Sequence, residues 1–347
     1  LVNRDSVLSS KGMLGKVIIW SIAIEAIGSL LLFFFWADEI AFKDLKDKIF
    51  FSVFHSFSAF NNAGFSLFTD GLSNSLVREN YAIHNIITIL VFFGALGFMT
   101  IFDIFDIDKI KERAKHPWKQ LSFSSKIALY FSIGLVLFGG VLFYALEYDN
   151  TLQGQSAGGI ITTSLFQSVT RTSGFNTVDI GSIGIPMLIV LIFLMFVGSS
   201  SSSTGGGIKT STFALLWSST IATIRGRKNA ELFKKTISND LIFRAYSVFL
   251  FFALGNLICI FLLSITESEI LAMEGRSLLD LIFEEISAFG TVGLSTGITS
   301  NLSTAGKIII VVSMFVGRVG TLTVAFAFGK KPISTSYKYP NGHTMVG

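Results

Sequence analysis

The sequence predicts an all-α integral membrane protein made of repeated units, each with a membrane span, a short re-entrant helix and a second span. Composition is the first observation, because 51% of the 347 residues are hydrophobic and 14% are charged, against about a quarter charged in soluble domains. The second is an alternation of long and short apolar segments, and the third is a glycine-containing pattern after each short segment. The mean hydropathy of +0.65 agrees with this class.

Cysteine and histidine usage narrows the function classes. The single cysteine, Cys259, excludes an internal disulfide, and the four histidines (His55, His84, His116 and His343) show no metal-ligand spacing. Together with the composition, this argues against a disordered chain, a disulfide-stapled secreted domain and an ordinary cytosolic enzyme.

Six apolar segments are long enough for a membrane span, which takes about 20 residues. They cover residues 17–36, 83–102, 127–146, 183–224, 245–265 and 308–328. Three shorter segments, each followed by a polar turn with glycine, lie between them at 49–60, 160–169 and 278–289. Segments this short do not cross a bilayer, so we expect re-entrant helices whose backbone is covered by protein or water.

The order long, short, long recurs three times, and the residues around the turns align. Residues 54–64 (FHSFSAFNNAG) match residues 283–293 (FEEISAFGTVG), and residues 166–174 (FQSVTRTSG) form a shorter third copy. The sequence therefore predicts a link at 1–16, three units at 17–105, 127–224 and 245–329, basic loops at 106–126 and 225–244, and a tail at 330–347.

The two basic loops indicate the topology. Lys and Arg accumulate in short cytoplasmic loops, so both loops are expected in the cytoplasm, and the three short helices then enter the membrane from outside. Nucleic-acid binding by these loops is the alternative, and their position beside spans favours topology.

The turns are suited to cation coordination. A short helix entering from outside directs its unpaired C-terminal carbonyl groups toward the membrane centre, and several such ends form an oxygen ring that replaces a cation's hydration shell. Oxygen ligands without paired carboxylates favour a monovalent cation. A tight turn is the alternative for any single glycine. The candidate filter residues are Asn61, Asn62, Ala63, Gly64, Arg171, Thr172, Ser173, Gly174, Gly290, Thr291, Val292 and Gly293.

A run of glycine and serine at 198–207 interrupts the fourth long segment. Such a run is tolerated inside a bilayer only where it lines a cavity. It resembles a phosphate loop, but Ile208 interrupts the required Gly-Lys-Ser/Thr order. We therefore expect a flexible obstruction, with a disordered kink as the alternative. The gate candidates are Gly198, Ser199, Ser203, Thr204, Gly205, Gly206, Gly207 and Lys209.

Arg318 completes the gate candidates, near the middle of the last span. A cation at that depth costs about 3 kcal/mol or more, so it is expected to face a cavity or a partner. Below a cation filter it would act as an electrostatic barrier, or it would donate to carbonyls of the 198–207 run. A salt bridge to Glu25 or Asp103 is the structural alternative.

Five motifs in order resemble the Trk/Ktr/HKT superfamily of potassium transporters, and within it the Ktr-type membrane translocation subunit. They are SAFNNAGFS (58–66), RTSGFNT (171–177), STGGGIKTSTFA (203–214), SAFGTVGLSTGIT (287–299) and MFVGRVGTLT (314–323). The resemblance extends over essentially the whole chain.

The resemblance implies K⁺ uptake across a bacterial inner or plasma membrane through four units around a pseudo-fourfold pore. It further implies a homodimer, no organic cofactor in this chain, and a cytoplasmic ring of RCK/KTN-type regulatory subunits that binds ATP or ADP. Gly64, Gly174 and Gly293 would be filter glycines, 198–207 the gating loop and Arg318 the cavity arginine. Because the chain matches the second, third and fourth units, we expect it to lack the first.

Three alternatives stay open. A Na⁺-permeable or Na⁺-coupled transporter of the same superfamily would share the architecture. A membrane-embedded enzyme would use His55 or the adjacent Glu284 and Glu285, but these fall at equivalent places in two repeats. A secondary transporter with inverted repeats is disfavoured because the units run in the same orientation.

Overall fold

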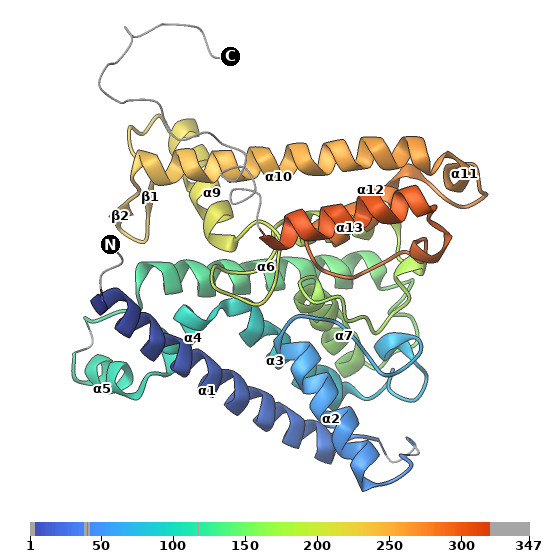
Figure 1. Cartoon of the computed structure of the whole chain (residues 1–347), viewed down its shortest axis with the longest axis horizontal. Helices are drawn as coiled ribbons and strands as arrows, with labels where there is room; N and C mark the ends of the chain where they lie inside the picture. Colours follow the sequence, from blue (N-terminus) through green and yellow to red (C-terminus); the bar gives the residue numbers. More distant parts are fainter. Residues whose placement is uncertain (1–3, 38–39, 41, 117, 320–347) are drawn as a thin grey trace, which may run out of the picture.

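The computed structural model describes residues 4–37, 40, 42–116 and 118–319, which are mainly helical (Figure 1). The elements in chain order are α1 (Arg4–Phe35), α2 (Leu45–Phe60), η1 (Gly71–Ser73), α3 (Tyr81–Leu96), α4 (Phe98–Phe105), α5 (Ile107–Lys115), α6 (Phe123–Glu147), α7 (Ala157–Thr170), η2 (Ile180–Ser182), α8 (Ile185–Phe196), α9 (Thr210–Ile224), β1 (Glu231–Leu232), β2 (Lys235–Thr236), α10 (Asn239–Thr266), α11 (Ser268–Leu271), α12 (Leu278–Phe289), η3 (Thr299–Asn301) and α13 (Thr304–Val319).

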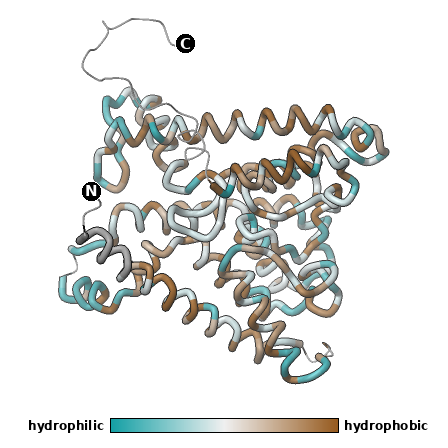
Figure 2. Tube along the Cα trace, in the orientation of Figure 1, coloured by the Kyte–Doolittle hydropathy of each residue, from teal (hydrophilic) through white to brown (hydrophobic). Residues whose placement is uncertain are grey.

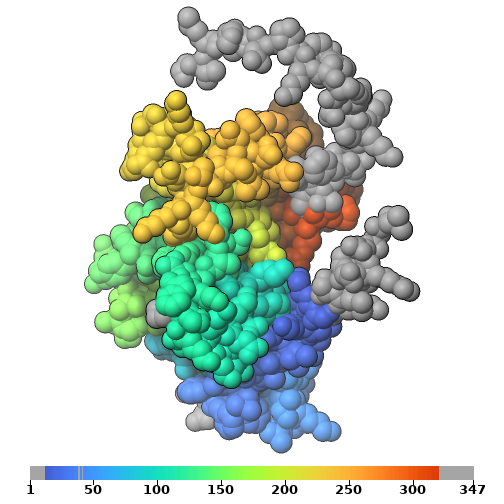
Figure 3. Space-filling model, turned by 90° about the vertical axis from the view of Figure 1, so that its left-hand side faces the viewer, coloured from blue at the N-terminus to red at the C-terminus, as the bar shows by residue number. Residues whose placement is uncertain are grey.

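The longest helices extend between two ends of the molecule. Figure 1 shows α5 and the β1–β2 hairpin at one end, called the α5 end, and α11 at the other, called the α11 end. In Figure 2 hydrophobic residues dominate the helices between these ends, and hydrophilic residues gather in the segments at the α5 end and the α11 end. Figure 3 looks onto the α5 end, where the α4–α5 region and the hairpin region are exposed.

Among the residues that the structure describes, three helices are long and apolar enough to cross a membrane: Gly12–Phe35, Phe123–Glu147 and Asn239–Thr266. The bent pair of α3 and α4 makes a fourth if it forms one broken span. Large apolar side chains such as Ile19, Phe34 and Phe261 are more than half exposed on these helices. This exposure is expected where side chains meet lipid rather than water.

Side-chain caps fix the beginning of each short helix. Asp44 accepts from the Asp47 N–H group at the start of α2, and Ser156 accepts from Gly159 at the start of α7. The start of α12 is closed by a capping box that contains Ser277. Each short helix then packs on long neighbours, since α2 contacts α1 and α3, α7 contacts α6 and α3, and α12 contacts α10 and α13.

The second predicted span is broken at a place that we did not predict. We expected a membrane span over 83–102, and in the structure α3 ends at Leu96 and α4 begins at Phe98 with a bend of 103°. Gly97 connects them with φ of 85°, a backbone angle that residues with a Cβ atom rarely adopt.

The basic loops also contain regular structure that was not predicted. Helix α5 forms within 106–126, where Asp106 caps it by accepting from the Asp108 and Lys109 N–H groups. Strands β1 and β2 pair antiparallel within 225–244, and Phe233 and Lys234 form their turn with positive φ.

Several predicted segments fall outside the described residues. These are residues 1–3 of the link, the part of the last span from 320 to 328, the end of the fifth motif at 320–323, and the tail at 330–347.

Two pairs of helices are tied together at the α11 end, α6 with α8 and α10 with α13. Glu147, the last residue of α6, accepts from the Gly184 N–H group (2.9 Å) immediately before α8. Glu267 follows α10 and accepts from the Ser303 N–H group (2.9 Å) immediately before α13. Because a helix N-terminus presents unpaired N–H groups and a partial positive charge, both carboxylates stabilise the start of the following helix.

Candidate ion pathway

The three short helices end in glycine turns that lie against one another. We call them the first turn (61–64, after α2), the middle turn (171–174, after α7) and the last turn (290–293, after α12). A Cβ atom on Gly64 would lie 1.9 Å from the Ser173 carbonyl oxygen, and one on Gly174 would lie 2.3 Å from the Val292 carbonyl oxygen. Glycine is therefore required at both positions, because the neighbouring backbones meet there.

The first and last turns share one hydrogen-bond pattern. In the first turn the Asn62 N–H group donates to the Ala59 carbonyl (3.1 Å) and Ala63 donates to Ser58 (2.8 Å), and the last turn repeats both bonds at the equivalent positions. This is a Schellman closure, whose left-handed residues are Asn62 (φ 51°) and Thr291 (φ 52°). A β-branched residue in this conformation is strained, so surrounding contacts must hold Thr291 there.

The middle turn closes differently because it is shorter. The N–H groups of Ser173 and Gly174 both lie 2.9 Å from the Thr170 carbonyl oxygen. Gly174 itself takes the left-handed conformation, with φ of 82°. The three turns are therefore similar in position but not identical in backbone geometry.

Arg171, which we predicted to be a filter residue, places its side chain against the C-terminal end of α8. Its side chain is 3% exposed, and Nη1 donates to the carbonyl oxygens of Leu194 (2.8 Å) and Val197 (2.6 Å). These carbonyls lie at the C-terminal end of α8, where a cation is favoured by the helix dipole. The side chain thus joins the middle turn to the segment that leads into residues 198–207.

A chain of polar side chains joins the first turn, the middle turn and the Gly/Ser loop (residues 198–207). Thr172 Oγ1 donates to Asn62 Oδ1 (2.8 Å), and Asn62 Nδ2 donates to Thr204 Oγ1 (2.8 Å). Asn62 is 5% exposed, and its side-chain amide accepts through Oδ1 and donates through Nδ2 in these two bonds.

The Gly/Ser loop contacts all three turns. Thr204 Oγ1 lies 3.0 Å from the Phe60 carbonyl oxygen at the end of α2. A Cβ atom on Gly205 would lie 3.7 Å from Thr172 Cβ, and one on Gly206 would lie 2.4 Å from the Gly290 carbonyl oxygen. The loop is therefore packed directly beside the turns rather than being an isolated kink.

The same loop fills the break between α3 and α4. The Ser200 N–H group donates to the Ala95 carbonyl (2.9 Å), and Phe98 donates to the Ser202 carbonyl (3.0 Å). A Cβ atom on Gly97 would lie 2.3 Å from the Ser201 carbonyl oxygen. The helix ends at this glycine because the loop supplies the partners that a continuing helix would have supplied.

Two basic side chains hold carbonyl groups of the loop. Arg318 Nη1 donates to the Thr204 carbonyl (2.8 Å), and Lys209 Nζ donates to the Gly205 carbonyl (2.6 Å). The predicted contact between Arg318 and the loop is therefore present.

The alternative salt bridge of Arg318 is wrong for the described residues. Asp103 pairs with Lys109 instead (3.2 Å), and Glu25 Oε1 accepts from Asn61 Nδ2 (2.8 Å). Glu25 thus fixes the first residue of the first turn.

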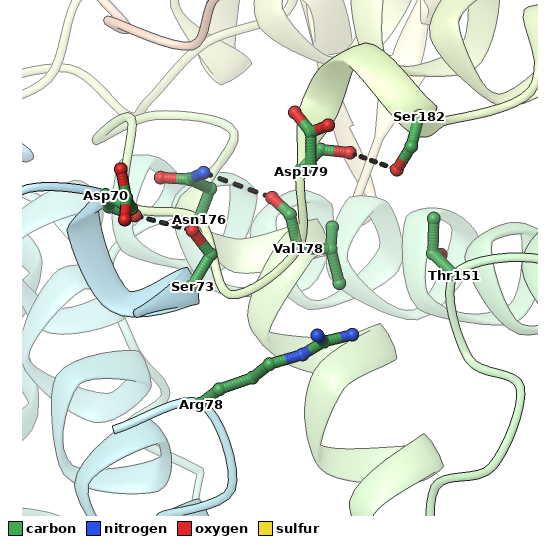
Figure 4. A pocket seen from close by; sticks show the side chains of 8 residues that line it. All are labelled: Asp70, Ser73, Arg78, Thr151, Asn176, Val178, Asp179 and Ser182. Atoms are coloured by element: carbon green, nitrogen blue, oxygen red, sulfur yellow. Dashed lines mark hydrogen bonds between the residues drawn. The ribbon is translucent and has the colours of Figure 1, made fainter. Parts of the chain in front are cut away.

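A separate polar pocket of about 610 Å³ opens beyond the turns. Figure 4 shows that carboxylates and a guanidinium group line it from different loops. Its lining residues are Asp70, Ser73, Arg78, Thr151, Asn176, Val178, Asp179 and Ser182. None of the predicted filter or gate residues is among them.

The comparisons with known proteins identify the family. The TrkH family model, described as a cation transport protein, matches residues 9–339. The chain belongs to the TrkH family. Members of this family are membrane proteins, in agreement with the apolar helices described above.

Two curated relatives match over all of this chain. The Ktr system potassium uptake protein B of Bacillus subtilis (strain 168) is 36% identical over 349 residues, and the match covers 74% of that protein. The protein of the same name from Vibrio alginolyticus is 34% identical over 353 residues, with 72% of it covered. The potassium/sodium uptake protein NtpJ of Enterococcus hirae is 33% identical over 94% of this chain and 70% of its own.

A solved structure shares the fold. The potassium transporter TrkH from Vibrio parahaemolyticus matches with a TM-score of 0.70 and 19% identity, over 94% of this chain and 65% of that one. At this identity the likeness shows the arrangement of helices and no more.

Proposed function

We propose that this chain is a pore-forming subunit for potassium uptake and that its three glycine turns form part of the ion filter. The main support is the convergence of the turns, at which the Ser173 carbonyl oxygen of the middle turn lies against Gly64 and the Val292 carbonyl oxygen of the last turn lies against Gly174. Membership of a cation transport family and the names of the curated relatives support K⁺ as the transported ion.

The physical mechanism follows from the carbonyl groups. A K⁺ ion that reaches the turns exchanges bound water for backbone oxygens, which are favourable ligands because the ends of three helix dipoles face the same region. A membrane potential of 100 mV supplies about 2.3 kcal/mol per charge. Uptake down this gradient therefore needs no ATP hydrolysis by the chain itself.

The Gly/Ser loop is proposed as the gate. It contacts the three turns and is held by Arg318 and Lys209, so its displacement would clear the space next to the filter. We propose that a cytoplasmic nucleotide-binding regulatory ring drives this displacement and that the subunit acts as a homodimer in the bacterial plasma membrane. Both proposals rest on the family resemblance. The pseudo-fourfold pore likewise remains a prediction.

The decisive test compares two glycines in the full-length protein reconstituted into liposomes. Gly174→Ser places a side chain where the Val292 carbonyl oxygen lies 2.3 Å away, so we expect the K⁺ over Na⁺ selectivity of uptake to fall. Gly134→Ser is the matched control, because a Cβ atom there meets nothing within 4 Å. Unchanged selectivity in a folded Gly174→Ser protein would count against the filter.

Na⁺ transport is the second candidate, favoured by the relative whose name includes both ions. Uptake of Na⁺ at rates comparable with K⁺, or a strict need for Na⁺ during K⁺ uptake, would support it. K⁺ uptake that is indifferent to external Na⁺, together with no measurable uptake of Na⁺, would exclude both versions.

A further inference from the structure

At one equivalent place on each short helix, a buried polar side chain contacts the segment that follows the glycine turn of that helix; on α2 the Ser58 hydroxyl makes a further such contact, with the Phe65 carbonyl oxygen (2.8 Å). The residues at the equivalent place are His55 on α2, Gln167 on α7 and Glu284 on α12, with exposed fractions of 0%, 0% and 6%. They occupy equivalent places in the three aligned copies, after Phe54, Phe166 and Phe283. Their chemistry differs although their position is the same.

His55 accepts from the segment after the first turn. Its Nδ1 lies 2.8 Å from the Phe51 carbonyl oxygen, and a carbonyl only accepts, so Nδ1 carries the proton and Nε2 is the acceptor. The Ser66 hydroxyl lies 3.1 Å from Nε2, and the Leu67 N–H group lies 3.4 Å from it. The neutral imidazole thus fixes the two residues that follow Phe65.

The other two helices make the same contact with other groups. Gln167 Nε2 donates to Thr177 Oγ1 (3.2 Å) after the middle turn. Glu284 Oε1 accepts from the Thr299 hydroxyl after the last turn, and Thr299 Oγ1 lies 2.9 Å from Ser295 Oγ. A hydroxyl group beyond each turn is therefore bound by the helix that precedes the turn.

The next residue on each helix faces elsewhere. The Ser56 hydroxyl donates to the Glu25 carbonyl on α1 (2.7 Å), and the Ser168 hydroxyl donates to the Val136 carbonyl on α6 (2.7 Å). Glu285 accepts from Ser313 on α13 (2.6 Å). Of two adjacent residues on each short helix, one therefore contacts a neighbouring helix. The other contacts the segment that follows the glycine turn, which we call the outgoing segment.

We propose that His55, Gln167 and Glu284 are positioning residues of the ion filter that hold the outgoing segments from behind, so that the turn carbonyls keep their places. The proposal rests on the proposed function in so far as it concerns selectivity. Glu284 is the most informative of the three, because its Oε2 has no hydrogen-bond partner among the described residues. It also lines a cavity of about 290 Å³ together with Thr291, Val292 and Gly293 of the last turn.

The test uses the full-length protein with substitutions on both sides of one contact. Glu284→Ala and Thr299→Val each remove the contact, and we expect either to lower the K⁺ over Na⁺ selectivity of uptake about tenfold. The double variant should be no worse than the single ones. Glu284→Gln should keep the selectivity of the unmodified protein, because the glutamine amide oxygen still accepts a hydrogen bond from the Thr299 hydroxyl.

Glu285→Ala is the matched control on the same helix. It removes a buried carboxylate that contacts Ser313 rather than the outgoing segment, so selectivity should stay unchanged. An equal loss of selectivity in Glu285→Ala and Glu284→Ala would overturn the proposal, as would normal selectivity in folded Glu284→Ala and Thr299→Val proteins.

A second measurement separates this proposal from the proposed function. Hydrogen exchange of the backbone amides at 294–299 should accelerate in Glu284→Ala and Thr299→Val and not in Glu285→Ala, whether or not the protein transports K⁺. If exchange is unchanged, the positioning role is wrong even when uptake is normal. If the unmodified protein takes up no K⁺, the proposed function fails and the exchange result still decides the role of Glu284.

Discussion

The buried guanidinium of Arg171 joins two regions that the sequence separates. Its Nη1 atom donates to the Leu194 and Val197 carbonyls, and among the described residues it forms no salt bridge. A buried charge is tolerated there because carbonyl oxygens at a helix C-terminus replace its hydration.

Replacing Arg171 tests that contact. Arg171→Met leaves two buried carbonyl oxygens without a donor, and we expect the free energy of unfolding to fall by about 2 kcal/mol or more. Thermal unfolding in detergent measures the change, and Arg171→Lys should lose less because it keeps a charged donor. A shift of the midpoint no larger in Met than in Lys would contradict the assignment.

At the residue scale the sequence located the turns but not their side-chain partners. Gly64, Gly174 and Gly293 stand out because the residues around them repeat along the sequence, and such a repeat can be recognised without a structure. The contact of Asn62 with Thr204 is not visible in this way, since two residues so far apart in sequence carry no shared signal without a fold.

The break between α3 and α4 sets the position of the Gly/Ser loop. Hydropathy predicts one span over 83–102 because the residues on both sides of Gly97 are equally apolar. A single glycine inside such a segment is compatible with a continuous helix. The backbone N–H and carbonyl groups of the loop, which lie within reach of the break, explain why the helix ends there.

Gly97→Ala tests this relation between the break and the loop. Alanine is strained at φ of 85°, and its Cβ atom would lie 2.3 Å from the Ser201 carbonyl oxygen. We expect displacement of the loop, a loss of stability of about 1–3 kcal/mol and faster basal K⁺ uptake. Gly134→Ala in α6 is the control, and uptake that rises equally in both variants would exclude the loop as the cause.

At the scale of the whole molecule, the hydrogen-bond ties at the α11 end join α6 to the start of α8 and α10 to the start of α13. Burial alone would raise the pKa of Glu267, but hydrogen bonds from Ser303, Thr266 and Gly306 outweigh it and hold the pKa below its ordinary value. Because the folded pKa is the lower one, the ionised carboxylate stabilises the fold above the ordinary carboxyl range. That contribution is lost as the pH falls through the folded pKa.

Acidification should therefore destabilise the protein partly through this tie. Between about pH 6 and about pH 3.5 the thermal midpoint should fall, and Glu267→Gln should show a weaker pH dependence together with a lower midpoint at neutral pH. Glu269→Gln, at an exposed position on α11, is the control. An unchanged pH profile in Glu267→Gln would contradict the assignment.

The long and short apolar helices were the most predictable part of the molecule. Long helices over 17–35, 127–146 and 245–265 follow from hydropathy alone. A segment of about 20 apolar residues in a bilayer must satisfy its own backbone hydrogen bonds, and a helix does so. The short helices follow from their length and their terminal glycines. Helix α5 and the β1–β2 hairpin were missed because their capping and turn residues lie in charged segments without apolar periodicity.

The contact between Arg318 and the Gly/Ser loop limits how firmly the loop is held in place. Arg318 holds the Gly/Ser loop through a single hydrogen bond to the Thr204 carbonyl, and a hydrogen bond to a charged group contributes about 1.5–3 kcal/mol. Alone, that bond favours the seated loop over a released one by a ratio of about 10 to 150. A closed subunit held in this way would still spend between about one part in ten and about one part in 150 of its time released. If the loop is the gate, low leak must depend on its other contacts, and a bias of only a few kcal/mol from a partner would reverse the populations.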